Sequence, residues 1–301
     1  MLSCSYIIPL YNAEKYITQA INSILKNNFL PHDEIIIVND CSTDRSLDVV
    51  NKLRSHQQDT TKDRIHIISH TKNKGSAAAS RNTAISHSSK EVIFCLDADN
   101  ILPGTKGLKI RQYLEENELD VCGPERIMFF TGNLHITHEW VFEKRLLSFK
   151  DILSCHFWPG PSGNYAFTRK YFDRIGPYPE NFGKAYDSWA YGFMQVAEGG
   201  KFGICGESYY LHRWGLSDSA FVLGASDPSI VLHPLLLKYS NLLRPEISKE
   251  ISTESFKKDW YNKIGTGFFY PDFSETIGRH HKLNLLVRLR WTVRMKLFAT
   301  Y

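Results

Sequence analysis

The 301-residue sequence lacks the apolar segments that would carry it into or across a membrane. It has no run of about 18 apolar residues, so no membrane-spanning helix is expected. The start of the chain, Met1–Ser5, has neither the basic segment nor the long apolar core of a secretory signal peptide. Its six cysteines include no C-x-x-C pair, which argues against zinc-ribbon and thioredoxin-like folds. These absences favour a cytoplasmic protein with reduced thiols.

Two glycine-rich signatures and a general charge bias are also lacking. No G-x-G-x-x-G follows the first apolar segment, which argues against a dinucleotide-binding dehydrogenase. The turn at Pro9–Asn12 is not the Gly-rich phosphate loop that a sugar-1-phosphate nucleotidyltransferase requires. The net charge is +4, and residues 276–301 alone contribute +6 with no acid. A nucleic-acid binder would need a basic surface on its folded core, so no nucleic-acid partner is expected.

What the sequence does contain is a regular alternation of strand and helix patterns over its first hundred residues. Four apolar runs predict buried strands, at Ser5–Pro9, Glu34–Val38, Arg64–Ile68 and Glu91–Leu96. Helical spacing follows the first three runs, over residues 16–25, through Leu53 and over Ser76–Ser86. Such alternation predicts an α/β fold with a mostly parallel, Rossmann-like central sheet flanked by helices.

The alternation loosens after residue 100, where a helix is expected near Leu108–Leu114 and a short strand near Asn164–Thr168. Residues 1–215 are therefore expected to form one domain, with a nucleotide-binding half over 1–100 and an acceptor and catalytic half over 101–215. Residues 216–301 show no clear strand–helix unit and are expected to form a C-terminal extension.

The end of this extension is basic. Its charged and apolar residues alternate over Arg288–Leu297, and this period of two predicts a half-buried strand, since in a helix the apolar residues would point all round. Two interpretations stay open: the tail contacts anionic lipid at the inner face of the membrane, or it docks on its own domain.

Polar clusters fall where the predicted parallel strands end, which is where α/β sheets bind ligands. Asp97 and Asp99 follow the fourth strand, one residue apart. Two carboxylates this close repel one another, and the usual relief is a bound cation, which can bridge to a diphosphate. A solvated turn is the alternative, because Asp and Asn are common turn residues.

Four segments occur in a specific order: Ile8–Asn12, Ile37–Asp44, Asn73–Asn82 and Leu96–Asp99. Together they resemble the P-x-Y-N, V-D-D-G-S-x-D, N-x-G-x-x-x-A-R-N and D-x-D motifs of the family 2 nucleotide-sugar-dependent glycosyltransferases, which have the GT-A fold. The resemblance departs at Asn39, where the family has an acid, and at Cys41, where it has Gly. A positive φ at Cys41 would strain the backbone.

The resemblance implies a nucleotide-sugar donor, expected to be a UDP-sugar. Asp40 would accept the imide N–H of uracil, while Pro9, Tyr11 and Asn12 would frame the base. Arg81 would bind base, ribose or phosphate through its planar guanidinium, and a helix-surface arginine is the alternative.

A metal, Mn²⁺ or Mg²⁺, is implied at the diphosphate, whose charge it would offset. Asp99 would bind it directly, and Asp97 would contact the ribose or help to hold the metal. His212 lies in a Y-x-H-R segment found in some members of the family, and its imidazole would complete the site. A structural role is the alternative for this lone histidine.

Inverting transfer also needs a base that deprotonates the acceptor hydroxyl. The resemblance implies Asp187, which precedes a helix leading to a Gly-containing turn; a helix N-cap is its alternative role. Glu180 is the weaker substitute. Further residues are implied around the sugar: Gly163 for close backbone approach, Trp158 or Trp189 for stacking, and Asp218 and Ser219 in an active-site loop. A core position is the alternative for Trp189.

These features predict a metal-dependent inverting glycosyltransferase that moves a hexosyl or N-acetylhexosaminyl group to a hydroxyl of a saccharide or lipid-linked saccharide. Its expected setting is surface polysaccharide or glycolipid biosynthesis. Retention of configuration stays open, because the outcome depends on where Asp187 lies. The rival hypothesis is a catalytically silent sugar-nucleotide-binding protein of an assembly complex.

Overall fold

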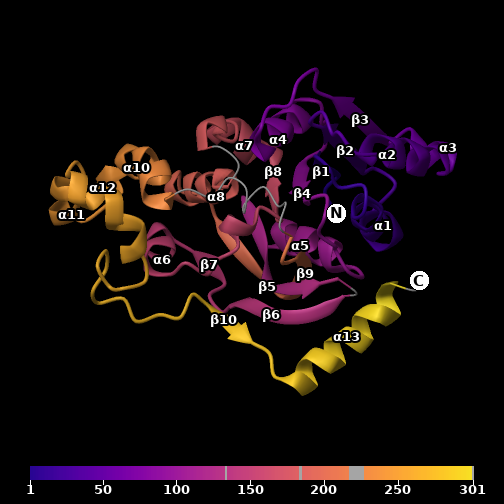
Figure 1. The fold of residues 1–301 in the computed structure, drawn as a ribbon. Helices are drawn as coiled ribbons and strands as arrows, with labels where there is room; N and C mark the ends of the chain where they lie inside the picture. The colour runs from indigo at the N-terminus through magenta and orange to yellow at the C-terminus, as the bar shows by residue number, and fades with distance from the viewer. Residues whose placement is uncertain (133, 183–184, 217–226, 300–301) are drawn as a thin grey trace.

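A computed structural model describes residues 1–132, 134–182, 185–216 and 227–299. A central sheet, flanked by helices, runs through the molecule (Figure 1). The first half contains β1 (Cys4–Leu10), α1 (Ile17–Asn27), β2 (Glu34–Asn39), α2 (Ser46–Ser55), α3 (Asp59–Lys62), β3 (Ile65–Ser69), α4 (Ala77–Ser86), β4 (Val92–Cys95) and α5 (Lys106–Glu116). The predicted alternation of strands and helices is therefore confirmed.

The middle of the chain is less regular. It contains β5 (Val121–Thr131), β6 (His135–Phe142), β7 (Leu146–Leu147), α6 (Phe149–Ser154), η1 (Gly160–Ser162), β8 (Ala166–Thr168), α7 (Arg169–Ile175), η2 (Glu180–Phe182), α8 (Asp187–Ala197) and β9 (Phe202–Arg213). The last part contains α10 (Pro228–Lys238), η3 (Ser240–Leu242), α11 (Pro245–Glu250), α12 (Glu254–Asp259), η4 (Trp260–Lys263), β10 (Gly278–Lys282) and α13 (Leu285–Ala299).

The strands of the described chain are ordered β10-β6-β5-β8-β4-β1-β2-β3, and β9 pairs with β5 and β7. β1 lies between β2 and β4 and is parallel to both. Every residue of β2 and β4 is buried, as expected for strands covered on both faces. Because β1, β2 and β4 are parallel, their carboxyl ends meet at one edge of the sheet, where the polar segments follow.

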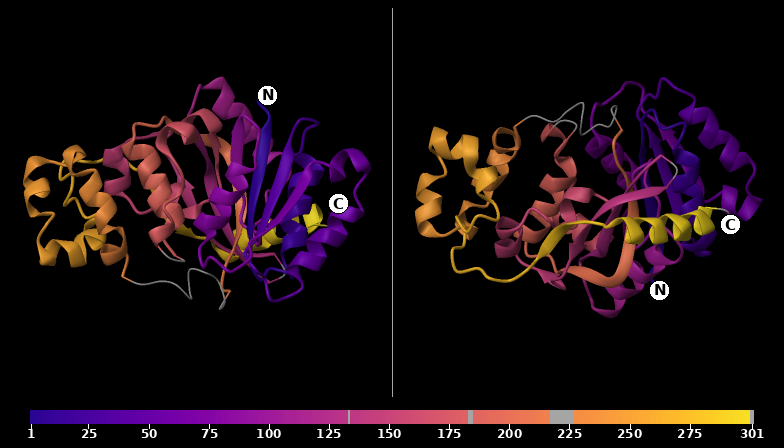
Figure 2. Two further views of the ribbon diagram at one scale, coloured as in Figure 1. Left: turned by 90° about the horizontal axis from the view of Figure 1, so that it is seen from above. Right: turned by 60° about the horizontal axis from the view of Figure 1, so that its bottom comes forward.

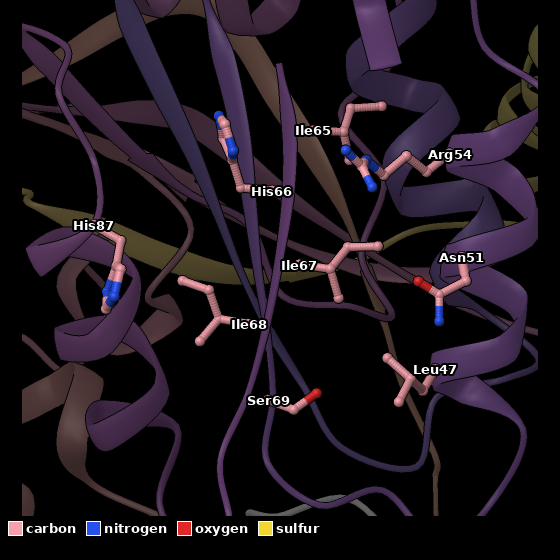
Figure 3. Close-up of a pocket in the computed structure, with 9 residues that line it drawn as sticks. All are labelled: Leu47, Asn51, Arg54, Ile65, His66, Ile67, Ile68, Ser69 and His87. Atoms are coloured by element: carbon pink, nitrogen blue, oxygen red, sulfur yellow. The ribbon is translucent and has the colours of Figure 1, made fainter. Parts of the chain in front are cut away.

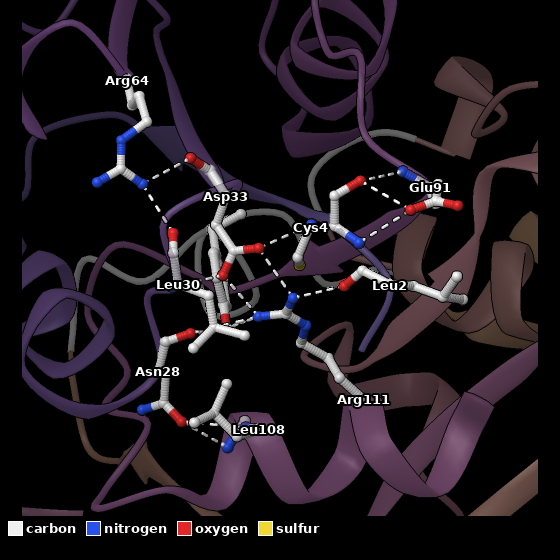
Figure 4. A network of polar contacts seen from close by, with 12 residues as sticks. Leu2, Cys4, Asn28, Leu30, Asp33, Arg64, Glu91, Leu108 and Arg111 are labelled. Atoms are coloured by element: carbon white, nitrogen blue, oxygen red, sulfur yellow. Dashed lines mark hydrogen bonds and ion pairs between the residues drawn. The ribbon is translucent and has the colours of Figure 1, made fainter. Parts of the chain in front are cut away.

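A buried ion pair fixes the opposite ends of β1 and β2 to α5 (Figure 4). Arg111 donates from Nη1 and Nη2 to the two carboxylate oxygens of Asp33, over 2.7 and 2.8 Å. Asp33 Oδ1 also accepts from the backbone N–H of Cys4, at the start of β1. The side chains of Arg111 and Asp33 are each only 1% exposed, so the charge of each is compensated by the other rather than by water.

The C-terminal extension forms helices rather than irregular chain. In Figure 1, α10, α11 and α12 lie to one side of the molecule, beyond α8, and Trp260 of η4 contacts Trp189 of α8 with ring centroids 6.1 Å apart. β10 then pairs antiparallel with β6, so the extension adds an edge strand to the central sheet. Of the residues described, no helix combines the length and apolarity needed to cross a membrane.

The predicted strand over Arg288–Leu297 is wrong, because these residues belong to helix α13 (Figure 2). The apolar residues of α13 point in more than one direction, as expected when this sequence forms a helix. Trp291 contacts Tyr209 of β9, with ring centroids 5.5 Å apart, and Val287 packs on the same cluster. Leu285 and Leu289 instead face away from the domain, 68% and 50% exposed. The helix thus docks on its own domain through only part of its apolar surface.

Candidate active site

The centre of the site is a buried arginine that joins two carboxylates. Arg81, on α4, donates from Nη2 to Asp97 Oδ1 over 2.7 Å and from Nη1 to Asp187 Oδ2 over 2.8 Å. Asp97 lies two residues after the end of β4, whereas Asp187 is the first residue of α8. One guanidinium therefore connects the predicted donor carboxylate with the predicted base, 90 residues apart in the sequence. The helix-surface alternative for Arg81 is wrong, since it is 2% exposed.

The environment of Asp187 suits a proton acceptor. Burial raises the pKa of Asp187 above the usual range for an aspartate, although the charge of Arg81 opposes the shift. The residue is 5% exposed and begins α8, while Tyr186 occupies the N-cap position, so the N-cap role considered for Asp187 is not observed. Arg81 keeps a further donor, because its buried Nε makes no hydrogen bond within the described part of the chain.

Asn164 and Gly163 hold the other side of this cluster. Asn164 accepts from the backbone N–H of Asp97 over 2.7 Å and donates to Asp97 Oδ2 over 2.8 Å. Gly163 has φ +69°, and a Cβ at this position would lie 2.5 Å from Ser188 Oγ and 3.1 Å from Arg81 Nη2. The predicted site residue Gly163 is therefore packed directly against the Arg81 cluster. Asn164 and Ser188 were not predicted, although both are sequence neighbours of predicted residues.

Asp40 lies in a second polar cluster, after β2. Its Oδ1 is 2.7 Å from His70 Nδ1 and accepts from the backbone N–H of Lys74 over 2.8 Å, and its Oδ2 accepts from the N–H of Gly75 over 3.3 Å. These donors belong to the segment that leads into α4, the helix that carries Arg81. The neighbouring Cys41 has φ +57°, so the strain considered for a Cys at this position applies. His70 was missed by sequence reasoning, although it lies two residues after the predicted third strand and directly follows β3.

The turn after β1 lies beside the Asp40 segment. Asn12 Oδ1 accepts from the backbone N–H of Thr43 over 2.8 Å, and the backbone N–H of Asn12 donates to Ser42 Oγ. Pro9 is paired in register with Val38, so it belongs to β1 itself. Tyr11 is 51% exposed, which leaves its ring accessible to a ligand.

The predicted metal ligand His212 lies next to Asn100, which is in the loop that carries Asp97 and Asp99. His212, on β9, has Nδ1 3.4 Å from Asn100 Nδ2, and burial lowers the pKa of His212 to about 4, so the imidazole is neutral at pH 7. Arg213 donates to the backbone carbonyl of Asp99 and fixes this loop to the sheet. No cluster of three His, Cys, Asp or Glu side chains able to hold an ion was found among the residues that could be searched. A metal here would need substrate oxygens as further ligands, as Mg²⁺ sites at diphosphates commonly do.

Three secondary predictions have different outcomes. Trp158 and Trp189 are 0% and 4% exposed, and their rings contact each other at 6.4 Å, so stacking of either ring on a sugar is contradicted by their burial in the core. Glu180 is exposed and accepts from Asn82 Nδ2, outside the Arg81 cluster. Asp218 and Ser219 lie outside the described residues.

A surface hollow elsewhere contains none of these residues. It lies along β3, the edge strand of the sheet, and is lined by side chains of β3, α2 and the end of α4, including His66, Asn51 and His87 (Figure 3). The cluster at the strand ends, rather than this hollow, carries the reactive groups.

Comparison with known proteins gives one family. The family model described as glycosyl transferase family 2 matches residues 5–176, more than half of the chain. The chain is 31% identical over 122 residues to the poly(ribitol-phosphate) β-N-acetylglucosaminyltransferase TarS of Staphylococcus aureus, a match covering 40% of this chain and 20% of TarS. It is 33% identical over 117 residues to the glycosyltransferase GlyG of Streptococcus pneumoniae, covering 39% of this chain and 36% of GlyG. The chain thus spans a minor part of the curated relatives that it matches.

The fold agrees with this comparison. The crystal structure of S. aureus TarS residues 1–349 in complex with UDP-GlcNAc superposes with a TM-score of 0.64 at 20% identity, covering 88% of this chain and 75% of that one. The complex of the same TarS fragment with UDP gives a TM-score of 0.61. The α/β GT-A fold that the sequence predicted is therefore confirmed.

Proposed function

The chain belongs to glycosyl transferase family 2, and from this premise we propose that it transfers a sugar, with inversion, from a UDP-linked donor to a hydroxyl group. The observation that carries the proposal is the double ion pair of Arg81 with Asp97 and Asp187. The same guanidinium thereby holds two carboxylates together: Asp97, at the expected donor position, and Asp187, which is buried and suited to accept a proton.

The donor would lie across the carboxyl ends of β1, β2 and β4. Asp40 is the acceptor for the imide N–H of uracil, because within the described part of the chain its Oδ2 accepts a single hydrogen bond, from Gly75 over 3.3 Å. Tyr11 and the backbone of Pro9 and Asn12 would frame the base. The TarS fragment, which shares the fold, is complexed with UDP and with UDP-GlcNAc, which supports a UDP-sugar as the donor class.

In the transfer step, the acceptor hydroxyl attacks the anomeric carbon in line with the bond to the diphosphate. Asp187 takes the hydroxyl proton, the new glycosidic C–O bond forms, and the bond from the anomeric carbon to the phosphate oxygen breaks, releasing UDP. Arg81 places a positive charge beside the reacting groups and lowers the pKa of Asp187 against the effect of burial. A base of this kind contributes about 10²–10⁴-fold to the rate.

We further propose that Mn²⁺ or Mg²⁺ is held by Asp99 and His212, with Asp97 contacting either the ion or the ribose. The neutral imidazole of His212 and the carboxylate of Asp99 are donors that such ions accept. When bound, the ion would supply positive charge to the diphosphate leaving group.

The acceptor is proposed to be a saccharide or lipid-linked saccharide, met at the cytoplasmic face of a membrane in surface polysaccharide or glycolipid biosynthesis. Helix α13 supports a peripheral contact, since Leu285, Leu289 and Val293 recur at four-residue spacing and are 68%, 50% and 60% exposed. Residues 276–301 contain six basic residues and no acid, so the segment would repel a second copy of itself and attract anionic lipid.

The membrane contact is tested by co-sedimentation with vesicles of phosphatidylcholine alone or mixed with phosphatidylglycerol. Leu289→Glu should weaken binding to the mixed vesicles, whereas Leu237→Glu, an exposed leucine on α10 (38%), should not. Equal binding to neutral and anionic vesicles would contradict the proposed contact.

The transferase and the silent binder differ in one assay. A panel of nucleotide-sugars is incubated with the protein and Mn²⁺, and release of the nucleoside diphosphate is measured without acceptor. A transferase slowly hydrolyses its donor and thereby identifies it. Binding of a nucleotide-sugar by calorimetry with no release, and no transfer to any saccharide tested, would instead identify the silent binder.

A further inference from the structure

One face of the sheet beyond His212 carries a row of aromatic side chains. Phe129 of β5 is paired in register with His212 of β9 and with His138 of β6, and His280 of β10 is paired with Trp140 of β6. Paired residues, and residues two apart on a strand, point to the same face of a sheet. With Trp214, which follows β9, we call this set the aromatic strip: Phe129, His138, Trp140, His212, Trp214 and His280.

The rings of the strip contact one another. The rings of Phe129 and His138 stack with centroids 4.3 Å apart, and Phe129 lies 5.0 Å from His212. Trp214 stands edge-on to both Phe129 and His138, at 5.5 and 5.3 Å. His280 extends the row, 4.9 Å from His138. These contacts hold the ring of Trp214 in a fixed position, which a binding platform requires.

The strip begins at the donor site. His212 Nδ1 lies 3.4 Å from Asn100 Nδ2, and the same amide group donates to Asp97 Oδ2 over 3.4 Å. Asp97 in turn contacts Arg81, which contacts the proposed base Asp187. A ligand on the strip would therefore lie next to the reacting groups.

The strip is accessible at its outer members. Trp214 is 49% exposed and His280 is exposed, His138, Trp140 and His212 are half-buried, and Phe129 lies beneath them at 3% exposure. The opposite face of the same strands is covered, because Met128 and Phe130 form a cluster with Trp291 of α13 packed against it. One face of β5 and β9 is thus covered by the protein itself, whereas Trp214 and His280 on the strip are exposed to solvent.

We propose that the aromatic strip binds a pyranose ring of the acceptor, with Trp214 as the stacking platform. A pyranose has an apolar face of C–H groups, which packs on an aromatic ring, and hydroxyls at its rim, which bond to imidazole nitrogens. His138 suits this role because burial and the nearby His280 lower its pKa to about 4, so that it is neutral at pH 7. This inference rests on the proposed function, since it places the acceptor beside the donor.

The test measures binding of methyl β-pyranosides of glucose, galactose and N-acetylglucosamine, and of ribitol 5-phosphate, by saturation-transfer NMR with UDP present. Trp214→Leu keeps apolar volume but removes the ring, and Trp214→Phe keeps a ring. Loss of one aromatic contact should raise the pyranoside Kd about 3–10-fold in Trp214→Leu. Trp214→Phe should stay close to wild type, as should Tyr270→Ala, a half-buried aromatic outside the strip.

The outcomes separate this inference from the proposed function. If the wild-type protein binds UDP but no pyranoside, or if Trp214→Leu binds pyranosides as tightly as wild type, the strip is not a sugar platform, although the proposed function stands. Binding of ribitol 5-phosphate alone would overturn the pyranose assignment. If the wild-type protein neither binds UDP nor hydrolyses any nucleotide-sugar, the proposed function itself fails.

Discussion

Replacing Arg81 by Met should expose how strongly the site depends on its central cation. Met approximates the length of the arginine stem but leaves Asp97 and Asp187 without their shared partner. The side chain of Asp187 is 7% exposed, so water cannot replace the guanidinium, whereas that of Asp97 is 25% exposed and keeps its bonds to Asn164. Breaking a buried ion pair from one side costs about 3–5 kcal/mol of unfolding free energy, and we expect this loss near pH 8.

The loss should depend on pH in a defined direction. Arg81 lowers the pKa of Asp187, so removing it raises that pKa further, and the folded variant binds protons more readily than the folded wild type. The stability of the variant relative to wild type therefore rises as pH falls. The deficit should therefore be smaller at pH 5 than at pH 8.

Urea unfolding followed by tryptophan fluorescence at both pH values measures this deficit, provided that the m-values agree. Arg169→Met is the matched control, because Arg169 bonds the carbonyl of Lys90 and the hydroxyl of Ser88 rather than a carboxylate, and its deficit should not depend on pH. The double variant Arg81→Met/Asp187→Asn should be more stable than Arg81→Met alone. A deficit below about 1 kcal/mol at pH 8, or one equal at both pH values, would refute the reasoning.

Three further predictions concern single positions. Gly163→Ala combines φ +69° with a Cβ 2.5 Å from a hydroxyl, so it should lower the free energy of unfolding in urea by about 1–3 kcal/mol and weaken UDP binding in calorimetry. Gly132→Ala, with φ +41° and open space around its Cβ, should lower it less. Equal losses in the two variants would contradict the close contact at Gly163. Turnover should fall on acidification, because protonated Asp187 cannot act as a base. Burial raises the pKa of Asp187, so a pH–rate profile with its acidic midpoint below about pH 4 would argue against this role. Asp33→Ala leaves Arg111 buried without its partner and should cost about 3–5 kcal/mol; a loss under about 1 kcal/mol would mean that this pair is dispensable.

Much of the fold could be predicted from the sequence, for a physical reason. Strands such as β2 are buried on both faces and therefore read as continuous apolar runs, and parallel pairing places the polar segments that follow them at one edge. Asp97 and Asp40 could be identified because each lies within two residues of the end of such a strand. The motif resemblance added the roles of these residues, which periodicity alone does not give.

The remaining features depend on tertiary packing that no local pattern encodes. The contact of Arg81 with Asp187 forms because α4 and α8 meet over the sheet, 106 residues apart in the chain. The tail shows the limit of periodicity, because the alternation over Arg288–Leu297 indicates a strand but the residues form α13. In this helix Trp291 packs against Tyr209 and Leu289 points outward, so only part of the apolar surface is buried. Likewise, Trp158 and Trp189 are core residues, which composition cannot distinguish from a sugar platform.

The central claim is that Asp187, held by Arg81 beside Asp97, is the base of a sugar transfer. The most direct test uses the donor identified in the nucleotide-sugar screen. Its turnover by wild type is compared with its turnover by Asp187→Asn, and UDP affinity is measured on the same samples. The account predicts UDP affinity close to that of wild type and turnover reduced by at least about 100-fold. Turnover near that of wild type, at unchanged UDP affinity, would contradict it.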